Sequence, residues 1–341
     1  MPSFYSLPFI KLQALGNDFI FIDAESLLES AARPLLSQWS AVAPLLAQNL
    51  CQRRTSIGAD GLILAMSLQV PELARLASVL YGSTSKDCDI SWTYHNSDGS
   101  VSDMCGNGLR CLALWAKEEK NFGNHIKAAT ALGTIAIDYK NENDITVALG
   151  APKLASKDIP FKSSLNKVLK EPFEIANSQF AITCLNVGNP HCVIFEADFL
   201  KPEFFNALNK SNKDDFFPSP LIPIAKAIEL DSHFPERTNV EFVRVLDRQH
   251  IEVLVWERGC GATLACGSGA VAAAVACVLE KRTERKVSVL LPGGSLLIDW
   301  SDDNVVKMTG SANMVFRGQT NISTEQLKTD KNISCPKVPA L

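Results

Sequence analysis

Two cysteines in this chain each stand directly before a Gly-x-Gly segment and a run of small, apolar, helix-forming residues. The segments are Cys105-Gly106-Asn107-Gly108 and Cys266-Gly267-Ser268-Gly269, and the runs that follow them are 109–119 and 270–281. A thiol at the start of a helix lies near unpaired backbone N–H groups and the positive end of the helix dipole, and both favour the thiolate. The glycines let the backbone amides come close to an anionic ligand. Two matched sites of this kind predict a pair of thiols that acts on one substrate.

These two segments belong to a long internal repeat. Cys105 and Cys266 are 161 residues apart, and the same interval separates the similar segments 133–139 and 294–300. A long repeat of this kind indicates two homologous domains rather than a solenoid. A looser match upstream pairs Gly16-Asn17 with Gly188-Asn189 at a different interval.

The elements that must position the thiols are mostly short strands around two helices. Alternation of apolar residues and turn signals predict three strand pairs, with the strands at 9–15 and 19–23, 240–245 and 250–257, and 287–291 and 296–300. The helix after Cys266 is almost entirely Ala and Val up to Leu279, and a helix that is apolar all round is a buried helix. We therefore expect an α/β (α+β) fold of two pseudo-symmetric domains. Each would be a curved, mainly antiparallel sheet wrapped around a central helix, with the active site in the cleft between the domains.

The repeat also sets the expected domain boundaries. The N-terminal domain is expected at 1–150, completed by a C-terminal strand near 310–318, and the second domain at 151–309. Segments 24–50 and 70–88 look like insertions, and residues 320–341, with scattered Lys, Asn, Thr and Pro, are expected to form a disordered tail.

Composition excludes several classes of protein. The chain has 341 residues, enough for two domains with sizeable cores, and its net charge of −4 favours neither nucleic acid nor an anionic membrane surface. No apolar run reaches the roughly 18 residues that span a bilayer, and the N-terminus shows no secretory signal. None of the ten cysteines shows the C-x2-C spacing of a zinc site. Because a long chain with so few cysteines is no disulfide scaffold, we expect a reducing, cytoplasmic location.

Seven motifs, in this order along the chain, resemble those of the diaminopimelate epimerase family. Five of them carry chemically useful side chains: Cys105-Gly-Asn-Gly-Leu-Arg110, Asn186-Val-Gly-Asn-Pro-His191, Arg237-Thr-Asn239, Trp256-Glu257-Arg258-Gly259 and Ala265-Cys266-Gly-Ser-Gly-Ala270. Two more lie near the ends of the matched region, Leu15-Gly-Asn17-Asp18 and Leu291-Pro-Gly-Gly-Ser295. The resemblance covers about residues 9 to 318, and the ordered set is far more specific than any one motif.

The resemblance implies a homodimeric isomerase that needs neither pyridoxal phosphate nor a metal. It would interconvert LL- and meso-2,6-diaminopimelate on the route to lysine and peptidoglycan precursors. Inverting a stereocentre by proton transfer requires a base on one face of the carbon and an acid on the other, and a thiolate and a thiol can fill these roles. Cys105 and Cys266 would form this coupled pair. Backbone amides at the two helix starts would stabilise the developing carbanion and its carboxylate, and these amides belong to Gly106, Asn107, Gly267 and Ser268.

The same resemblance implies a polar cage for the unreactive end of the substrate. Its members would be Asn17, Asn96, Asn189, Asn239, Glu257 and Arg258. Arg258 suits a bidentate grip on the distal carboxylate, and Glu257 could accept hydrogen bonds from the distal ammonium. His191 and Glu257 would also help to set the proton balance near the thiols.

Each of these residues also has a purely structural interpretation. A lone Cys before Gly is more often buried and inert, Asn96 and Asn239 could be turn residues, His191 could be a satisfied loop histidine, and Glu257-Arg258 could be a surface charge pair. The chain also departs from the family pattern at Ala262, where many members carry Glu, and at Gly61, where some members carry a substrate-contacting Gln. These two changes affect fine substrate contacts rather than the thiols.

Other functions remain open at this stage. A proline-racemase-like enzyme would keep both cysteines but needs no distal polar cage. The phenazine-type isomerases of this fold lack the paired thiols. A non-catalytic anion-binding protein would not explain why both helix-start positions are Cys rather than Ser or Thr. A disulfide between Cys105 and Cys266 could also inactivate the enzyme on oxidation.

Overall fold

The structure, a computed structural model, describes residues 4–175, 178–199 and 216–327. The chain divides into two compact units. Unit 1 comprises residues 1–147 and 311–341, and unit 2 comprises residues 148–310. Unit 1 is therefore built from both ends of the chain.

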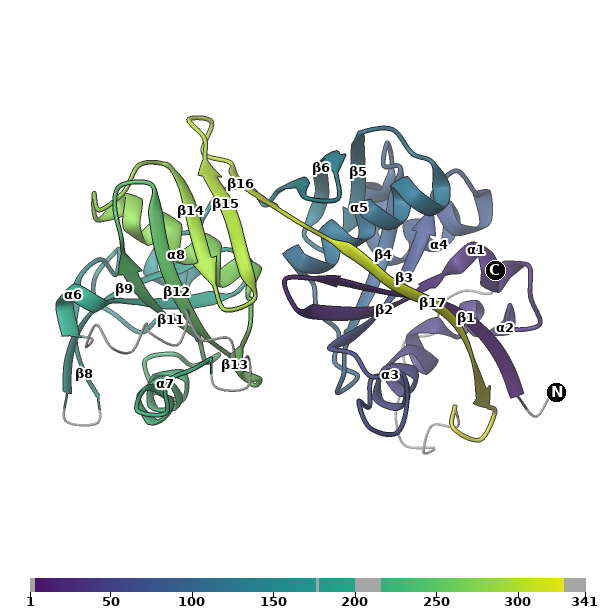
Figure 1. Ribbon diagram of the computed structural model, residues 1–341, viewed down its shortest axis with the longest axis horizontal. Helices are drawn as coiled ribbons and strands as arrows, with labels where there is room; N and C mark the ends of the chain where they lie inside the picture. The colour runs from purple at the N-terminus through teal and green to yellow at the C-terminus, as the bar shows by residue number, and fades with distance from the viewer. Residues whose placement is uncertain (1–3, 176–177, 200–215, 328–341) are drawn as a thin grey trace. The chain divides into compact units, whose positions relative to one another are not determined.

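Unit 1 is one mixed sheet packed around helix α5 (Gly106–Lys120) (Figure 1). Its strands lie in the order β17-β1-β2-β3-β4-β5-β6-β7. The pairs β2–β3 and β4–β5 are parallel and the other pairs are antiparallel. The strand bounds are β1 Phe4–Ala14, β2 Asn17–Asp23, β3 Gly61–Ser67, β4 Ile90–Asn96, β5 His125–Thr130, β6 Gly133–Asn141, β7 Asp144–Ala148 and β17 Asn313–Ser323.

Unit 2 repeats this arrangement around helix α8 (Gly267–Leu279). Its strands lie in the order β8-β9-β10-β11-β12-β14-β15-β16, and the parallel pairs are β10–β11 and β12–β14. The short β13 pairs with the other end of β12. The bounds are β8 Glu171–Ile175, β9 Ser178–Asn186, β10 Pro190–Phe195, β11 Asn239–Val245, β12 His250–Glu257, β13 Gly261–Thr263, β14 Lys286–Leu291, β15 Gly294–Trp300 and β16 Val306–Gly310.

The series of parallel and antiparallel pairs is the same in both units, strand for strand. In this series β17 occupies in unit 1 the place that β8 occupies in unit 2. The expected fold class, a pseudo-symmetric α+β fold of two mainly antiparallel sheets with one central helix each, is confirmed.

Helix α8 is buried because its sequence is apolar on every side, whereas α5 also buries the polar side chains of Asn107 and Arg110. All residues of α5 from Gly106 to Ala116 are buried, as are nearly all residues of α8 from Gly267 to Cys277. Helix α5 ends at Asn121, whose left-handed backbone lets its N–H bond the carbonyls of Ala116 and Lys117.

The remaining helices connect strands or cover the outer side of the sheets. They are α1 Ala24–Leu28, α2 Pro34–Ser37, α3 Trp39–Leu50, α4 Pro71–Tyr81, η1 Gly82–Ser85, η2 Ser156–Asp158, α6 Glu196–Phe199 and α7 Leu221–Glu229. In unit 1, apolar side chains of α1 to α4 form one buried cluster with those of β1 to β3.

Segment 24–50 is not an insertion. It holds α1 to α3 and forms part of the connection between the parallel strands β2 and β3, and parallel neighbours need a long crossover. The equivalent connection in unit 2, from β10 to β11, spans residues 196–238. Segment 70–88 differs, because it separates the antiparallel strands β3 and β4, whereas the equivalent β11 and β12 are joined by the short turn 246–249.

The prediction that a disordered tail begins at residue 320 is wrong for residues 320–323. Strand β17 continues to Ser323 and pairs with β1 along its whole length, so that Phe4 lies opposite Ser323 (Figure 1). Ile322 is 3% exposed and belongs to the core of unit 1. Apolar packing of this one side chain and the strand pairing order a segment whose composition is otherwise polar. Residues 328–341 of the expected tail lie outside the described residues.

The buried thiols are expected to make the protein less stable at alkaline pH. Burial raises the pKa of Cys51 to about 12 and raises the pKa values of Cys111, Cys192, Cys266 and Cys277 as well. These thiols stay protonated in the native state while the unfolded thiols ionise above about pH 8.5. The unfolded state then binds fewer protons, and the free energy of unfolding falls as pH rises, by on the order of 1 kcal/mol per pH unit for each thiol.

We expect this fall in urea unfolding of the reduced protein between pH 8 and 10. The Cys277→Ala variant lacks one of these thiols. Its free energy of unfolding should therefore fall less steeply with pH, by on the order of 1 kcal/mol per pH unit. An unfolding free energy that does not change over this range would contradict the prediction.

Within the described part of the chain, no helix is both long enough and apolar enough to cross a membrane.

Candidate active site

Cys105 is the N-cap of α5, as its position before Gly-Asn-Gly predicts. Its Sγ accepts a hydrogen bond from the backbone N–H of Gly108 at 3.4 Å, and its carbonyl accepts one from Leu109. The thiol is half-buried and lies 3.8 Å from Oδ1 of Asn17. Gly106 and Asn107 are the first two residues of the helix, so their backbone N–H groups point toward the helix start. The sulfur and these amides thus share the positive end of one helix dipole.

Asn17 is held beside Cys105 by a charged cluster. Its Nδ2 donates to Oδ2 of Asp60 at 2.8 Å, which turns its Oδ1 toward the thiol and toward Nδ2 of Asn107 at 3.2 Å. Arg53 forms ion pairs with both Asp60 and Asp18. Asp60 lies in the turn before β3, and burial raises the pKa of its carboxyl. Asp60 is therefore a positioning residue for Asn17, and it carries no signal in the sequence beyond its place in a Gly-Ala-Asp-Gly turn.

Arg110 holds the side chain of Asn107, the second residue of α5, in place. It is fully buried on α5, and its guanidinium donates to Oδ1 of Asn107 at 2.7 Å and to the carbonyls of Gly106 and Ser311. Burial lowers the pKa of Arg110 to about 10, which still leaves it charged at neutral pH. A cation one helical turn from Cys105 favours the thiolate there. The equivalent position on α8 is Val271, so this charge is special to unit 1.

Cys266 is the N-cap of α8 in the same geometry. Its Sγ accepts from the N–H of Gly269 at 3.4 Å and lies 3.4 Å from Oγ of Ser268. The thiol is 6% exposed, and its pKa is raised first by burial and then by the negative charges of Glu257 and Glu241. Both Cys105 and Cys266 are free thiols. The two helix starts match in geometry but differ in charge, with a buried arginine at one and carboxylates at the other.

His191 lies on β10 with both ring nitrogens in short hydrogen bonds. Its Nδ1 is 2.7 Å from Oε1 of Glu241 on the neighbouring strand β11, and its Nε2 is 2.7 Å from Oδ1 of Asn189. His191 and Glu241 are both fully buried. His191 is thus a strand residue rather than a loop residue, but both of its ring nitrogens are satisfied, as the structural alternative expected, so its part in the proton balance stays a prediction.

Asn239, Glu257 and Arg258 meet where β11 begins and β12 ends. Oδ1 of Asn239 accepts from the backbone N–H of Arg258 at 2.9 Å, and Nδ2 of Asn239 donates to the carbonyl of Pro190. Oε1 of Glu257 accepts from the hydroxyl of Thr263 at 2.5 Å. The Arg258 guanidinium is exposed and donates to the carbonyl of Glu236. Asn239 thus ties the His191 strand to the Glu257-Arg258 turn.

This turn has a second anchor in Glu229 of α7. Its carboxylate accepts from Nε1 of Trp256 at 2.7 Å and from the N–H of Gly259 at 2.9 Å, on either side of Glu257 and Arg258. Glu229 is 5% exposed. Nothing in its local sequence marks it, because a glutamate near the end of an amphipathic helix is ordinarily a solvated residue.

Asn96 ends β4 in unit 1 and closes a turn. Its Nδ2 donates to Oγ of Ser100 at 2.9 Å, and its backbone N–H donates to the Ser100 carbonyl. The half-buried side chain therefore has the turn role that its Ser-Asp-Gly neighbours suggested. Its Oδ1 still has capacity to accept further hydrogen bonds, so a substrate contact stays a prediction.

The structure brings the expected site residues together in two groups. Unit 1 gathers Cys105, Gly106, Asn107 and Asn17, and unit 2 gathers Cys266, Gly267, Ser268 and His191 with Asn189, Asn239, Glu257 and Arg258. Asp60, Arg110, Glu229 and Glu241 were missed by the sequence analysis. Each of these four is a charged residue that fixes an expected site residue or the turn that carries it.

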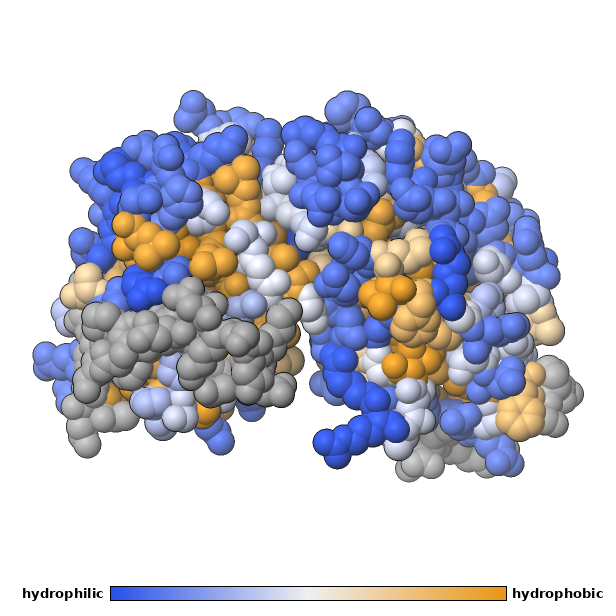
Figure 2. Space-filling view, viewed as in Figure 1, coloured by the Kyte–Doolittle hydropathy of each residue, from blue (hydrophilic) through white to orange (hydrophobic). Residues whose placement is uncertain are grey.

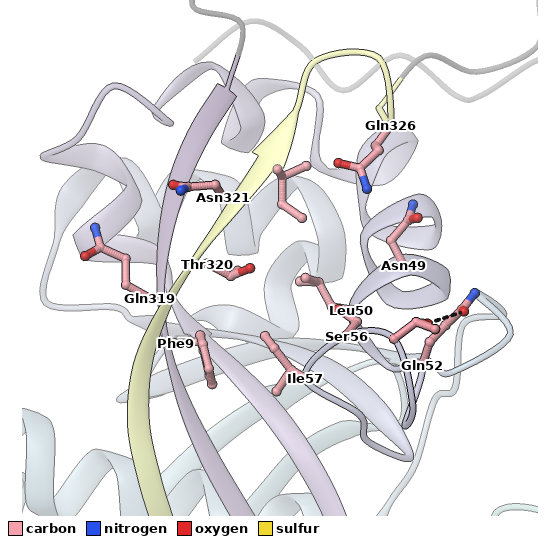
Figure 3. Close-up of a pocket in the computed structure, with 12 residues that line it drawn as sticks. Phe9, Asn49, Leu50, Gln52, Ser56, Ile57, Gln319, Thr320, Asn321 and Gln326 are labelled. Carbon is pink, nitrogen blue, oxygen red and sulfur yellow. Dashed lines mark hydrogen bonds between the residues drawn. The ribbon is translucent and has the colours of Figure 1, made fainter.

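A cavity of about 530 Å³ lies elsewhere in unit 1 (Figure 3). Figure 3 shows amide side chains of Asn49, Gln319, Asn321 and Gln326 around it, with Phe9 and Ile57 at its lower end. None of its lining residues is a cysteine, histidine or charged residue. The lining of this cavity therefore offers no group suited to acid–base chemistry.

Comparison with known families shows which proteins this chain is similar to. The family model described as diaminopimelate epimerase matches residues 9–155 and 183–315. A chloroplastic diaminopimelate epimerase of Oryza sativa subsp. japonica is 40% identical over 319 residues, which cover 92% of this chain and 80% of the relative. A diaminopimelate epimerase of Microcystis aeruginosa is 39% identical over 318 residues, covering 92% and 98% of the two chains.

Solved structures share the fold at low sequence identity. A hydroxyproline epimerase from Agrobacterium vitis, solved with bound trans-4-hydroxy-L-proline, matches with a TM-score of 0.58 and 9% identity over 93% of both chains. A phenazine biosynthesis protein of the PhzF family from Bacillus anthracis matches with a TM-score of 0.55 and 14% identity, covering 93% of this chain and 99% of that one. These likenesses establish the architecture alone.

Proposed function

Because the chain belongs to the diaminopimelate epimerase family, an isomerase family, we propose that it converts LL-2,6-diaminopimelate to meso-2,6-diaminopimelate in lysine and peptidoglycan precursor biosynthesis. The observation that carries the proposal is the matched pair of N-cap thiols, each bonded to the third backbone amide of a buried helix. A binding protein has no use for a thiol at both positions.

The proposed reaction is a proton exchange at one α-carbon. A thiolate removes the α-hydrogen from one face while the thiol of the other cysteine delivers a hydrogen to the opposite face. The carbon is inverted, the two sulfurs exchange protonation states, and no other group is consumed. A thiolate–thiol pair of this kind needs no metal and no pyridoxal phosphate.

The charges around the thiols indicate their resting states. Arg110 lies near Cys105, and Glu257 and Glu241 act on Cys266. We therefore propose that Cys105 rests as the thiolate and Cys266 as the thiol. The helix amides of Gly106, Asn107, Gly267 and Ser268 would stabilise negative charge on the reacting carboxylate and carbanion.

The remaining residues bind the distal amino-acid head. Arg258, which is exposed, would grip the distal carboxylate. Asn17, Asn96, Asn189, Asn239 and Glu257 would supply hydrogen-bonding oxygens and amides. His191 and Glu257 would set the proton balance at Cys266, since Glu257 is the carboxylate with the largest charge effect on that thiol.

We further propose a homodimer located in the cytoplasm. All nine cysteines that the structure describes are free, which suits a reducing compartment. Figure 2 shows apolar side chains gathered over β1 and β17 of unit 1. On the edge strand β17, Val315 and Phe316 are 54% and 46% exposed. An exposed apolar edge strand is a surface on which a second copy can pair.

This surface gives a direct test of the dimer. Phe316→Asp places a charge on the edge strand and should convert the dimer to a monomer in sedimentation velocity. Val101→Asp, at an exposed position remote from β17 in the chain, should leave the dimer intact. A Phe316→Asp protein that sediments as the wild type does would contradict this interface.

The function is tested by proton NMR of LL-diaminopimelate in D2O with the reduced enzyme and no added pyridoxal phosphate. Deuterium should enter one α-position as the meso isomer forms. If the folded, reduced protein leaves LL-diaminopimelate unchanged, the proposal is wrong. Proline is then the next substrate to test, since a proline-racemase-like enzyme of this fold would act on it.

A further inference from the structure

Glu241 is a buried carboxylate whose presence the fold does not require. It lies on β11 with no exposed surface, and its Oε1 is 2.7 Å from Nδ1 of His191. Its Oε2 makes no hydrogen bond within the described part of the chain. A Cβ added at Gly269 would lie only 2.9 Å from Oε1, so the carboxyl lies against the first turn of α8. Burying a carboxyl with one oxygen unsatisfied destabilises the folded state.

Unit 1 shows what the same position holds when no function demands a charge. In the parallel pair β10–β11, His191 lies opposite Asn239, and in the equivalent pair β2–β3, Phe19 lies opposite Gly61. Two residues further along β11 and β3 stand Glu241 and Ile63. A Cβ added at Gly108 of α5 would meet Ile63, as one added at Gly269 meets Glu241.

The equivalent of the His191–Glu241 pair is therefore the apolar pair Phe19–Ile63. Phe19 and Ile63 are both fully buried. At these two positions unit 1 has two apolar side chains, whereas unit 2 has an imidazole and a carboxyl. The polar pair carries a cost in stability without an evident gain in packing, which is a signature of a functional position.

The two contacts of His191 fix the number of hydrogens that the pair holds. With the Asn189 amide oxygen facing Nε2, that nitrogen carries a hydrogen. The contact between Nδ1 and Oε1 needs a second hydrogen, on either the ring or the carboxyl. In both forms the pair as a whole is neutral and holds one hydrogen more than a neutral imidazole beside a carboxylate.

The groups around the pair are all acidic. Burial raises the pKa of Glu241, and the negative charge of Glu257 on β12 raises it further. The thiols of Cys266 before α8 and Cys192 on β10 also feel the charge of Glu241. Among these groups His191 is the one basic partner of Glu241, so the extra hydrogen lies in the contact between the two side chains.

We infer that Glu241 is a positioning residue that acts through His191. Its carboxyl retains the second hydrogen of the pair, fixes the plane of the imidazole and directs Nε2 to Asn189 in the candidate site. The expected effect on turnover rests on the proposed function. The presence of a hydrogen between Nδ1 of His191 and Oε1 of Glu241 does not depend on that function.

The test uses the full-length, reduced protein and the Glu241→Gln variant. Glutamine keeps the shape of the side chain and removes its charge. Glu252→Gln is the matched control, because Glu252 is also a buried carboxyl of this sheet but pairs with Arg244. NMR of protein labelled with ¹⁵N-histidine reports the ring hydrogens, and the chain has only five histidines. The His191 signals are assigned by their loss in His191→Asn.

The wild type and Glu252→Gln should show a strongly low-field hydrogen on the Nδ1 side of His191, and Glu241→Gln should lack it. Because general acid–base groups contribute about 10²–10⁴-fold, kcat for diaminopimelate should fall by on the order of 10²-fold in Glu241→Gln, with KM little changed. A low-field signal that persists in Glu241→Gln, or an equal loss of kcat in Glu252→Gln, would overturn the inference. A wild type without epimerase activity that still shows the signal only in the presence of Glu241 would refute the proposed function and support the pair.

Discussion

Replacing either Cys105 or Cys266 by alanine is expected to lower the rate of diaminopimelate epimerisation by on the order of 10³-fold or more. Each thiol supplies one of two proton transfers that must occur on opposite faces of the carbon, and a positioned acid or base contributes about 10²–10⁴-fold to such a step. Water cannot replace either sulfur efficiently. The rate is measured by deuterium incorporation from D2O, as in the test of function.

The chain offers a matched control in each helix. Cys111 on α5 and Cys277 on α8 are fully buried thiols of the same helices. Their alanine variants should keep epimerase activity within a few-fold, because these sulfurs do not stand at a helix start. If a folded Cys105→Ala or Cys266→Ala variant retained near-normal turnover, the two-thiol mechanism would be wrong.

Replacing Arg110 by methionine is expected to give the largest loss of stability. The guanidinium satisfies the side-chain oxygen of Asn107 and the carbonyls of Gly106 and Ser311. Each buried acceptor left without a donor costs about 1–3 kcal/mol, so the free energy of unfolding should fall by about 3 kcal/mol or more. The contact with Ser311 also ties α5 to the segment that leads into β17.

Urea unfolding measures this loss, with Arg317→Met as the control. Arg317 is 60% exposed and pairs with Glu119 at the surface, so its loss should cost less than about 1 kcal/mol. A decrease for Arg110→Met no larger than that of the control would show that Arg110 is not part of the framework of unit 1. Because Asn107 loses its anchor, we also expect weaker epimerase activity in the Arg110 variant at temperatures where it stays folded.

Much of the fold was predictable because its signals are local. The helix starts depend on Cys-Gly-x-Gly segments in which the N-cap and the third amide are three residues apart. The burial of α8 follows from a run of Ala and Val within the helix itself. Strand pairs such as β14–β15 are joined by short glycine turns, so their pairing also depends on neighbouring residues.

The sequence could not show which polar residues are buried. Glu241 lies in an ordinary alternating strand, and its partner His191 is 50 residues away in the chain. Arg110 reads as a helix surface residue, but it reaches the carbonyl of Ser311, which is 201 residues away. Asp60 and Glu229 likewise act on Asn17 and Gly259 in distant segments.

Two larger features were also beyond local inference. The polar residues from 320 onward look disordered, but the edge of β1 orders them by strand pairing as far as Ser323. Segment 24–50 looks like an insertion until the parallel direction of β2 and β3 shows that a crossover is required there. The two thiols, their helix caps and the repeated architecture could be inferred from the sequence, since these depend on residues a few positions apart. The buried acids and the arginine around the thiols became visible in the folded chain alone, because a buried charge is stabilised by partners that folding brings within hydrogen-bonding distance from far along the chain.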